Sequence, residues 1–337
     1  MNRFRNHLKD AEFEAQIKNS YITNSPTLLK ELYKIKNFSF SDKPIFISGE
    51  TGTGKTVVAE LIDKIVGYNK MLDINCSQYT DELIASELFG HVRGAFTGAN
   101  DDKVGVLERA NNGIIFLDEI HALSPKAQKT LLKAIEEKEF YPVGSDKKVK
   151  SNFRVVSATC ENIFQLIQSG QFREDLYARI STFSINLPPI RERAVDIMLL
   201  IEHFLSKQPF RILINDEAEK ILKKYDWPRN TREIQDLVEN WVAHGHRLIT
   251  PEVLPVQIKT NINPNKEIVS DFYLDLIEDM GLREFLIVFK KELIQGMVRR
   301  HRGVVKHASA AMGTSYGNLT GFLRSNSHKS FGTRRSL

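Results

Sequence analysis

One octapeptide sets the strongest limit on how this chain can fold. Residues 49–56 read GETGTGKT and match the pattern G-x-x-x-x-G-K-[ST] at every position. The apolar run at 43–48 predicts a short buried strand before it, and residues 56–66 are apolar at helical spacing after it. A glycine-rich loop between a strand and a helix turns backbone N–H groups and a helix N-terminus toward a phosphate. A chance glycine turn would not have this context, so the sequence predicts a phosphate-binding loop.

The pattern also assigns roles within the loop. Lys55 is expected to reach the β- and γ-phosphates of a nucleoside triphosphate, and Thr56 to ligand Mg²⁺. The cofactors expected are therefore ATP and Mg²⁺. The loop residues expected to bind the nucleotide are Gly49, Glu50, Thr51, Gly52, Thr53, Gly54, Lys55 and Thr56.

The rest of the first half alternates between strand-like and helix-like runs. Apolar runs that predict strands also occur at 70–75, 112–117, 154–158 and 183–187, with helical patterns between them, such as 124–137. This alternation predicts an α/β fold with a mostly parallel sheet. From residue 192 to about 247 the pattern is helical, with no strand-like run before Leu248, and the polar stretch 250–270 reads as a linker.

Two acidic residues follow the apolar run 114–117. Asp118 is expected to hold Mg²⁺ together with Thr56, and Glu119 to polarise an attacking water. Two acids after a buried strand could be turn residues, but beside a phosphate loop they favour hydrolysis of a nucleotide. Arg173 and Arg179 lie six residues apart in FREDLYAR, residues 172–179. They could stabilise charge in the transition state of a neighbouring subunit, or form surface ion pairs with the acids between them.

Several motifs in a fixed order resemble the AAA+ domain of bacterial enhancer-binding proteins, the activators of sigma-54 RNA polymerase. The resemblance covers residues 21–250, and its most specific element is the hexapeptide GAFTGA at 94–99. The motifs are GETGTGKT (49–56), SELFGHVRGAFTGA (86–99), GIIFLDEI (113–120), FREDLYARI (172–180), LPPIRER (187–193) and WPRNTREI (227–234).

The resemblance implies further roles. Asn75 matches an asparagine that can pair with Glu119, Arg173 and Arg179 match arginine fingers, and Arg232 matches a sensor arginine on the lid. The hexapeptide would contact sigma-54, with Phe96 and Thr97 as the contact pair among Gly94, Ala95, Phe96, Thr97, Gly98 and Ala99. Two positions depart from the family pattern: Cys160 stands where Asn or His is usual, and Arg229 where the family has glycine.

Charge and resemblance together suggest a DNA-binding C-terminus. Residues 281–337 contain eleven Lys or Arg against two Asp or Glu, a balance of +9 within a chain of +5. Such a tail attracts nucleic-acid phosphates. It resembles the Fis-type helix-turn-helix of the same family, with a helix at 282–300, a shorter one at 301–311 and, after a turn, a would-be recognition helix at 315–324. The expected DNA contacts are Ser315, Tyr316, Asn318, Leu319 and Arg324. A basic helical dimerisation module without specific DNA contacts is the alternative.

The resulting domain plan has five parts. Residues 1–20 form a short extension, 21–187 an AAA+ α/β ATPase subdomain, 188–250 a helical lid, 251–270 a linker and 271–337 the helix-turn-helix. Twenty residues cannot form a receiver domain, so the protein is expected either to be constitutively competent or to be held in check by a separate protein. Our hypothesis is regulation in trans. Fingers in trans require a homo-oligomer, and the family implies a hexamer.

Composition limits the remaining possibilities. The chain has no apolar run of about 18 residues and no secretory signal pattern, so we expect neither a membrane span nor export. Its two cysteines, Cys76 and Cys160, are too few for a disulfide framework, which favours a cytoplasmic, reduced setting. The predicted function is sigma-54-dependent activation from an upstream double-stranded DNA site. The alternatives are another AAA+ remodelling machine and a regulator that acts on a different polymerase form.

Overall fold

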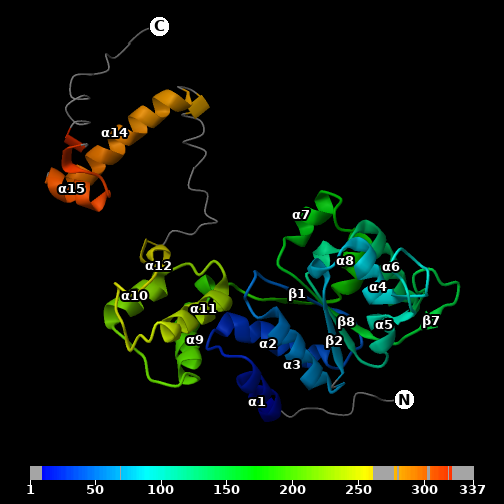
Figure 1. The fold of residues 1–337 in the computed structure, drawn as a ribbon. Coiled ribbons are helices and arrows are strands. Elements are labelled where there is room, and N and C mark those ends of the chain that lie inside the picture. The colour runs from blue at the N-terminus through cyan, green and yellow to red at the C-terminus, as the bar shows by residue number, and fades with distance from the viewer. Residues whose placement is uncertain are drawn as a thin grey trace, which may run out of the picture. The chain divides into compact units, whose positions relative to one another are not determined.

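The computed structural model describes residues 10–68, 70–260, 277–278, 281–301, 304–317 and 319–320. The chain divides into two compact units, Met1–Asn263 and Pro264–Leu337 (Figure 1). The first unit contains an α/β core and a helical lid, and the second contains helices.

A five-stranded sheet in the order β2-β5-β8-β1-β9 forms the centre of the first unit, and all its neighbouring strands pair in parallel. Each strand overlaps one of the five runs predicted from the sequence, so the parallel α/β arrangement is confirmed. Asn75 on β2 lies opposite Asp118 on β5. The strands are β1 (Ile45–Ser48), β2 (Met71–Asn75), β5 (Ile114–Asp118), β8 (Arg154–Thr159) and β9 (Phe183–Asn186).

Helices cover both faces of this sheet, which explains why its central strands read as continuous apolar runs. On β5, Ile114 and Phe116 pack with the first helical layer, while Ile115 and Leu117 pack with the second. The first layer contains α1 (Asp10–Ser20), α2 (Pro26–Phe38) and α3 (Lys55–Val66). The second contains α4 (Asp81–Phe89), α5 (Val106–Arg109), α6 (Pro125–Glu137), α7 (Ile163–Gln168) and α8 (Glu174–Ile180).

Local sequence fixes where several of these helices begin. Both α2 and α6 start at a Ser-Pro pair, in which the serine side chain accepts a hydrogen bond from the first turn and proline fits the first helical position. Three short 3₁₀ turns, η1 (Cys76–Gln78), η2 (Ile120–Ala122) and η3 (Ile190–Glu192), follow β2, β5 and the end of β9.

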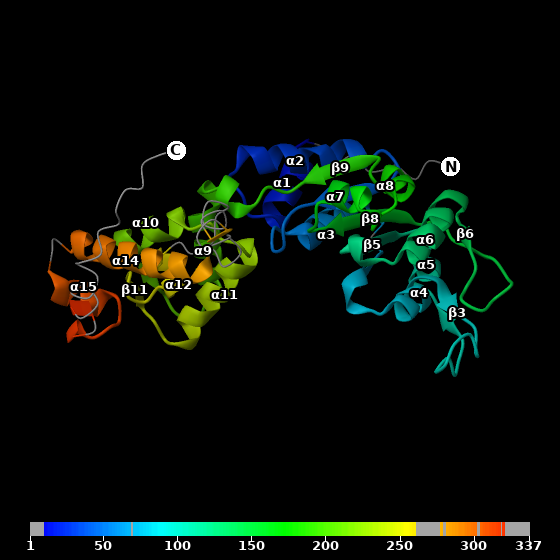
Figure 2. The ribbon, with the colours of Figure 1, turned by 90° about the horizontal axis from the view of Figure 1, so that it is seen from above.

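Two small antiparallel hairpins project from the second layer. One pairs β3 (Gly90–His91) with β4 (Lys103–Val104), and the other pairs β6 (Glu139–Phe140) with β7 (Val149–Lys150). Figure 2 shows both hairpins extending outward at the same end of the unit. Their bases are joined, because Val143 donates to the carbonyl of Gly90 (2.9 Å) and accepts from the amide of Val92 (3.1 Å).

The lid is mostly helical, with two differences from the sequence analysis. A two-residue strand lies inside the stretch expected to contain none, because so short a strand has no detectable period. Residues 251–260, expected to begin a linker, belong to the lid instead, since Leu254 and Ile258 are buried in its core. The elements are α9 (Val195–Ser206), β10 (Leu213–Ile214), α10 (Asp216–Lys224), α11 (Asn230–Ala243), β11 (Leu248–Ile249) and α12 (Val256–Thr260), with β10 and β11 paired in parallel.

The N-terminal extension is also part of the folded unit. Phe13 and Ile17 on α1 are 1% and 2% exposed and pack in the same cluster as α2 and α3. An apolar pair four residues apart on a helix faces one side, which is the side that meets the core.

A buried ion pair connects this N-terminal region to the lid. Arg193 donates to Asp196 (3.3 Å) and to the backbone carbonyl of Thr53 in the phosphate loop (3.4 Å). Asp196 also accepts hydrogen bonds from the Thr23 hydroxyl (2.6 Å) and the Asn24 amide (2.7 Å). Arg193 and Asp196 are 2% and 0% exposed. One pair thus connects the chain start, the phosphate loop and the lid.

The second unit contains α14 (Leu282–Arg300) and α15 (Val305–Ala311). Ile294, Ala308 and Leu319 form its buried centre. The predicted long helix is confirmed, and a turn at 312–313 follows α15. Among the helices that the structure describes, none combines the length and hydropathy needed to cross a membrane.

The buried pair makes a stability prediction. Replacing Asp196 by alanine leaves the Arg193 guanidinium buried without its carboxylate, which should lower the free energy of unfolding by about 3–5 kcal/mol. Urea unfolding followed by tryptophan fluorescence measures this, because Trp227 and Trp241, the two tryptophans of the chain, are both buried in the lid. Glu192→Ala, which removes an exposed acid nearby, is the control. A loss below 1 kcal/mol in Asp196→Ala would contradict the assigned role.

Candidate functional site

The glycine-rich loop has the backbone that its sequence predicts. Gly52 and Gly54 have φ of 79° and 102°, conformations that residues with a side chain rarely adopt. Gly52 must also be small, because a Cβ there would lie 2.2 Å from the carbonyl oxygen of Arg229 on the lid. The helix α3 begins directly after Gly54, so the unpaired amides of its first turn face the space above the loop. This is the geometry that receives an anion.

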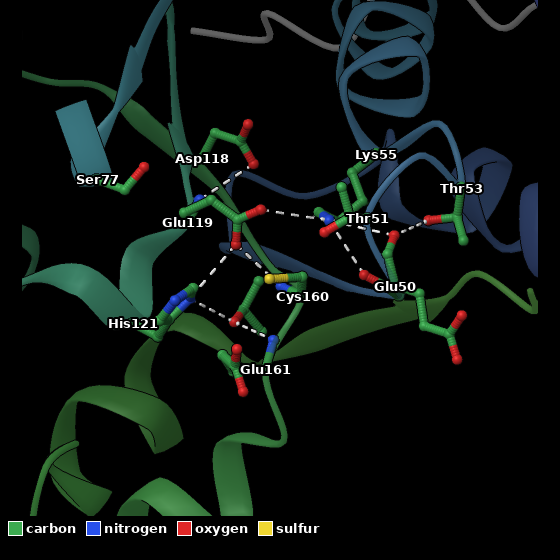
Figure 3. Close-up of polar contacts among 12 residues, drawn as sticks. Glu50, Thr51, Thr53, Lys55, Ser77, Asp118, Glu119, His121, Cys160 and Glu161 are labelled. Atoms are coloured by element: carbon green, nitrogen blue, oxygen red, sulfur yellow. Dashed lines mark hydrogen bonds and ion pairs between the residues drawn. The ribbon is translucent and has the colours of Figure 1, made fainter. Parts of the chain in front are cut away.

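Lys55 connects the loop to the acid pair (Figure 3). Its ammonium donates to the carbonyl oxygens of Gly49 (3.1 Å) and Glu50 (3.4 Å), and lies 3.5 Å from Oε1 of Glu119. The side chain is only 7% exposed. Thr56, the next residue, is exposed at the start of α3.

Asp118 and Glu119 stand at the carboxyl end of β5, beside this lysine. Glu119 has φ of 49°, a left-handed backbone that is costly for a residue other than glycine and is common at functional sites. Burial and the neighbouring Glu119 charge raise the pKa of Asp118. A divalent cation beside Asp118 would stabilise its charged form, so the donor set of Asp118 and Thr56 fits Mg²⁺, which prefers oxygen ligands.

The Glu119 carboxylate has neighbours other than the predicted one. Its Oε2 accepts from the amide of Cys160 (3.0 Å) and lies 3.4 Å from Nδ1 of His121. Asn75, expected to pair with Glu119, instead accepts from the amide and hydroxyl of Ser77 (3.0 and 2.7 Å). In this structure the expected pair is therefore not formed, because Asn75 caps η1 and Glu119 turns toward β8.

The lid touches the loop through residues that the sequence analysis missed. Arg191 forms a bidentate ion pair with Glu50 (2.6 and 2.8 Å), and it lowers the pKa of that carboxyl. Asn230 donates to Glu50 (3.1 Å) and to the carbonyl of Thr51 (3.0 Å). Both residues lie in quoted motifs, LPPIRER and WPRNTREI, so the signal was present, but only Arg232 was expected to contact the nucleotide there.

Arg232 lies in the first turn of α11, beside the loop. The amide of Thr231 donates to the carbonyl of Gly52 (3.0 Å), and the Cβ of Arg232 would be 3.2 Å from a Cβ placed at Gly52. The Arg232 side chain is exposed. Its position is therefore suited to reach a ligand held by the loop.

The arginine at 229 does not disturb the lid turn. Its φ is −104°, an ordinary value that does not require glycine, and its guanidinium pairs with Asp236 (2.8 Å). Trp227 is fully buried and donates its indole N–H to the carbonyl of Leu222 (3.0 Å). Trp227 therefore packs in the core of the lid.

A cavity of about 280 Å³ opens beside Gly54. Its walls come from the N-terminal segment, the start of α3 and the lid, so a ligand there would contact three parts of the unit. The sequence analysis did not predict it, because its walls are brought together only by the fold. The lining includes Tyr21, Ile22, Val57, Leu200, His203 and Phe204.

The two candidate finger arginines differ within this single chain. Arg173 is exposed and pairs with Asp175 (2.6 Å), as the surface alternative expects. Arg179 is half-buried, and its Nε lacks a hydrogen-bond partner. Across the part of the chain that the structure describes, neither arginine is bonded to the phosphate loop.

The hexapeptide 94–99 lies at the tip of the β3–β4 hairpin. A hydrogen bond from Gly94 to the carbonyl of Ala99 (2.8 Å) closes the loop. Thr97 is exposed, while the Phe96 ring is half-buried and meets the His91 ring edge-on at 5.0 Å. Phe96 also lines a cavity of about 690 Å³ with residues of α4, α6 and the second hairpin.

Three of the expected DNA contacts lie among the described residues. Ser315 and Tyr316 are exposed. Leu319 is only 2% exposed and packs against Ile294 and Ala308, so its assignment as a DNA contact is wrong: it is the apolar residue that holds its helix onto α14 and α15. Asn318 and Arg324 lie outside the described residues.

Comparison with known proteins gives two family matches. Residues 21–186 match the sigma-54 interaction domain, and residues 191–270 match the AAA+ ATPase lid domain. The chain is similar to regulatory protein AtoC of Escherichia coli K12, with 33% identity over 87% of this chain and 65% of AtoC. It is also similar to the Nif-specific regulatory protein of Azospirillum lipoferum, with 38% identity over 66% of this chain and 36% of the relative.

A solved structure agrees with these matches. NtrX from Brucella abortus in complex with ADP superposes with a TM-score of 0.65 and 27% identity, over 90% of this chain and 68% of NtrX. The chain spans about a third to two thirds of the length of the curated relatives that it matches. The sheet, the lid and both family matches show that the chain belongs to the sigma-54-dependent transcriptional regulators and has their AAA+ ATPase fold.

Proposed function

We propose that this protein hydrolyses ATP in an oligomeric ring and uses the 94–99 loop to remodel the closed complex of sigma-54 RNA polymerase. The observation that carries the proposal is one continuous arrangement: Lys55, Asp118 and Glu119 meet at the end of β5, and the intact GAFTGA loop lies on the same α/β unit. The family match supports sigma-54 as the target.

The cradle for the nucleotide is built by the chain itself. The amides at the start of α3 and the Lys55 ammonium would hold the phosphates, and the cavity beside Gly54 has room for a base between Tyr21 and the lid. The resemblance to an ADP-bound structure supports adenine as that base. Thr56 and Asp118 would hold Mg²⁺, which when bound neutralises charge on the phosphate oxygens.

Glu119 would orient the attacking water and accept its proton. In the structure this carboxylate is held by Lys55, His121 and the Cys160 amide, so its oxygens have fixed directions. Lys55 would move its bonds from the loop carbonyls and Glu119 to the phosphates when a nucleotide enters. Oε1 of Glu119 would then be released from Lys55 and could act on water, while Oε2 keeps its contact with the Cys160 amide.

A route from this site to the 94–99 loop follows the chain. Asn75 stands opposite Asp118 and caps η1, and α4 leads from there into β3. A shift of Asn75 toward a freed Glu119 would therefore pull on η1 and α4. In the structure the Phe96 ring rests against His91, so displacement of the loop would expose Phe96 to a partner.

Assembly and DNA binding complete the proposal. Arg173 caps the start of α8, Arg179 lies on this helix, and both would act on the nucleotide of a neighbouring subunit in a homo-oligomer such as a hexamer. Ser315 and Tyr316 are exposed on the second unit, whose helix α15 presents Lys306 to solvent. These residues would meet double-stranded DNA through bases and phosphates.

The hydrolysis step predicts different defects for two variants. Glu119→Gln should still bind ATP but hydrolyse it about 10²–10⁴-fold more slowly, because a positioned general base contributes that much. Lys55→Ala should lose binding as well. Fluorescent ATP-analogue binding and phosphate release measure the two steps separately. Wild-type turnover in Glu119→Gln would contradict the role of this carboxylate.

The proposed role of the 94–99 loop predicts variants that hydrolyse ATP but do not open promoters. Phe96→Ala and Thr97→Ala should keep ATP hydrolysis within about threefold of wild type, because they leave the phosphate site intact, yet form no open complexes on a sigma-54 promoter. A promoter-opening assay with permanganate footprinting measures this. Asn100→Ala, just outside the hexapeptide, is the matched control and should keep promoter opening. Full promoter opening by Thr97→Ala would favour a different remodelling target.

The basic second unit predicts salt-dependent DNA binding. The logarithm of the association constant should fall linearly with the logarithm of salt concentration, because bound phosphates release counterions. Lys306→Gln should reduce the slope by about 1, whereas Lys220→Gln on the lid should leave it unchanged. Anisotropy titrations with a labelled duplex measure the slopes. A flat salt response would contradict DNA binding by this unit.

A further inference from the structure

Glu119, His121 and Cys160 bring an oxygen, a nitrogen and a sulfur ligand atom together. All three atoms lie within 4.8 Å of one another, and all three residues are half-buried. Glu119 and His121 follow β5, and Cys160 follows the neighbouring strand β8, so the register of the sheet places them side by side. Figure 3 shows the Cys160 sulfur, the His121 ring and the Glu119 carboxylate turned toward one another.

The spacing of this cluster is close to that of a tetrahedral metal site. With metal–nitrogen and metal–oxygen bonds of about 2.0–2.1 Å, the nitrogen and oxygen of a tetrahedral zinc site are about 3.3–3.4 Å apart. Nδ1 of His121 and Oε2 of Glu119 are 3.4 Å apart. In such a site the sulfur lies about 3.5–3.6 Å from the nitrogen and oxygen ligand atoms. Because the three ligand atoms here lie within 4.8 Å of one another, the Cys160 sulfur would need to move inward by about 1 Å.

The ligand types select the metal. A thiolate, an imidazole and a carboxylate suit Zn²⁺, whereas Mg²⁺ requires oxygen ligands in an octahedron. The two ions would not share ligands, because the Mg²⁺ donors proposed above are Thr56 and Asp118. The two carboxylate oxygens of Glu119 have different neighbours: Oε1 faces Lys55, and Oε2 faces His121 and Cys160, so Oε2 is the oxygen that would bind Zn²⁺.

We propose that Glu119, His121 and Cys160 form a Zn²⁺ site, and that an ion bound there stops ATP hydrolysis by occupying the Glu119 carboxylate. On binding, the Cys160 thiol gives up its proton to solvent and its sulfur forms a bond to the ion. Nδ1 of the neutral His121 ring exchanges its hydrogen bond with the Thr159 hydroxyl (2.9 Å) for a bond to the ion. No electron transfer is involved, so removal of the ion restores the starting state. The inhibitory consequence rests on the proposed function, whereas the binding site does not.

Metal binding is tested on the full chain without nucleotide. Titration with Co²⁺ should give one equivalent of bound ion with a thiolate-to-cobalt charge-transfer band, and Zn²⁺ should displace it. Cys160→Ser should lose the band and bind Zn²⁺ at least about 100-fold more weakly, because loss of a ligand exceeds the cost of losing an outer partner. Cys76→Ser is the matched control, since Cys76 is the other cysteine and lies outside the cluster.

The outcomes of the binding experiment are distinct. A charge-transfer band that persists in Cys160→Ser, or that disappears in Cys76→Ser, would overturn the site. His121→Ala gives an independent check and should weaken Zn²⁺ binding while keeping the cysteine. Thermal unfolding of each variant confirms that a lost band reflects a lost ligand rather than a lost fold.

Inhibition is measured separately, with saturating ATP, excess Mg²⁺ and a zinc buffer. Zinc should lower wild-type hydrolysis at least about 10-fold, by removing the general base, and a zinc-selective chelator should restore it. For Cys160→Ser the ratio of rates with and without zinc should stay within about twofold, whatever its basal rate. Wild-type hydrolysis that is unchanged by bound zinc would overturn the inhibitory role. A protein that binds cobalt as expected but never hydrolyses ATP would instead refute the proposed function.

Discussion

The buried ammonium of Lys55 is the interaction on which the site depends. It donates to two carbonyls of the phosphate loop and faces Glu119. It therefore connects the loop that follows β1 to the end of β5. A lysine that is 7% exposed needs such partners, because an unpaired charge out of water is costly. The same partners can be exchanged for phosphate oxygens. We infer that nucleotide entry and the release of Oε1 of Glu119 are coupled, because Lys55 takes part in both.

The lid is connected to the same loop by separate contacts. Glu50 is held by Arg191 and Asn230, the amide of Thr231 donates to Gly52, and the buried Arg193 reaches the carbonyl of Thr53. Every one of these contacts ends on the phosphate loop. A change in loop geometry would therefore reach the lid through direct contacts, and the cavity beside Gly54 lies where the lid and the loop meet.

Much of this arrangement could be predicted from the sequence, because the predicted features depend on short stretches of chain. The phosphate loop, the acid pair and the five strands each depend on residues adjacent in the chain, so pattern and spacing suffice. The lid contacts of Glu50 and the Tyr21 cavity were missed because they join segments that are far apart in sequence. Asn75 was assigned to Glu119 by resemblance, yet in the structure it caps η1. The sequence does not distinguish between Glu119 and Ser77 as its partner, because that depends on the geometry of the fold. Leu319 was assigned to DNA by its place in a helix, and its burial followed from the packing of that helix.

The most direct test of the account is a cross-link from position 97. A photo-reactive residue replaces Thr97, and the protein is mixed with sigma-54 RNA polymerase with no nucleotide, with ADP, or with ADP and a metal fluoride that mimics the transferred phosphate. The account predicts that sigma-54 is captured mainly in the metal-fluoride state, and that the additional substitution Lys55→Ala abolishes this capture. Capture that is absent in every state, or equal in all of them, would contradict a loop that is moved by the nucleotide.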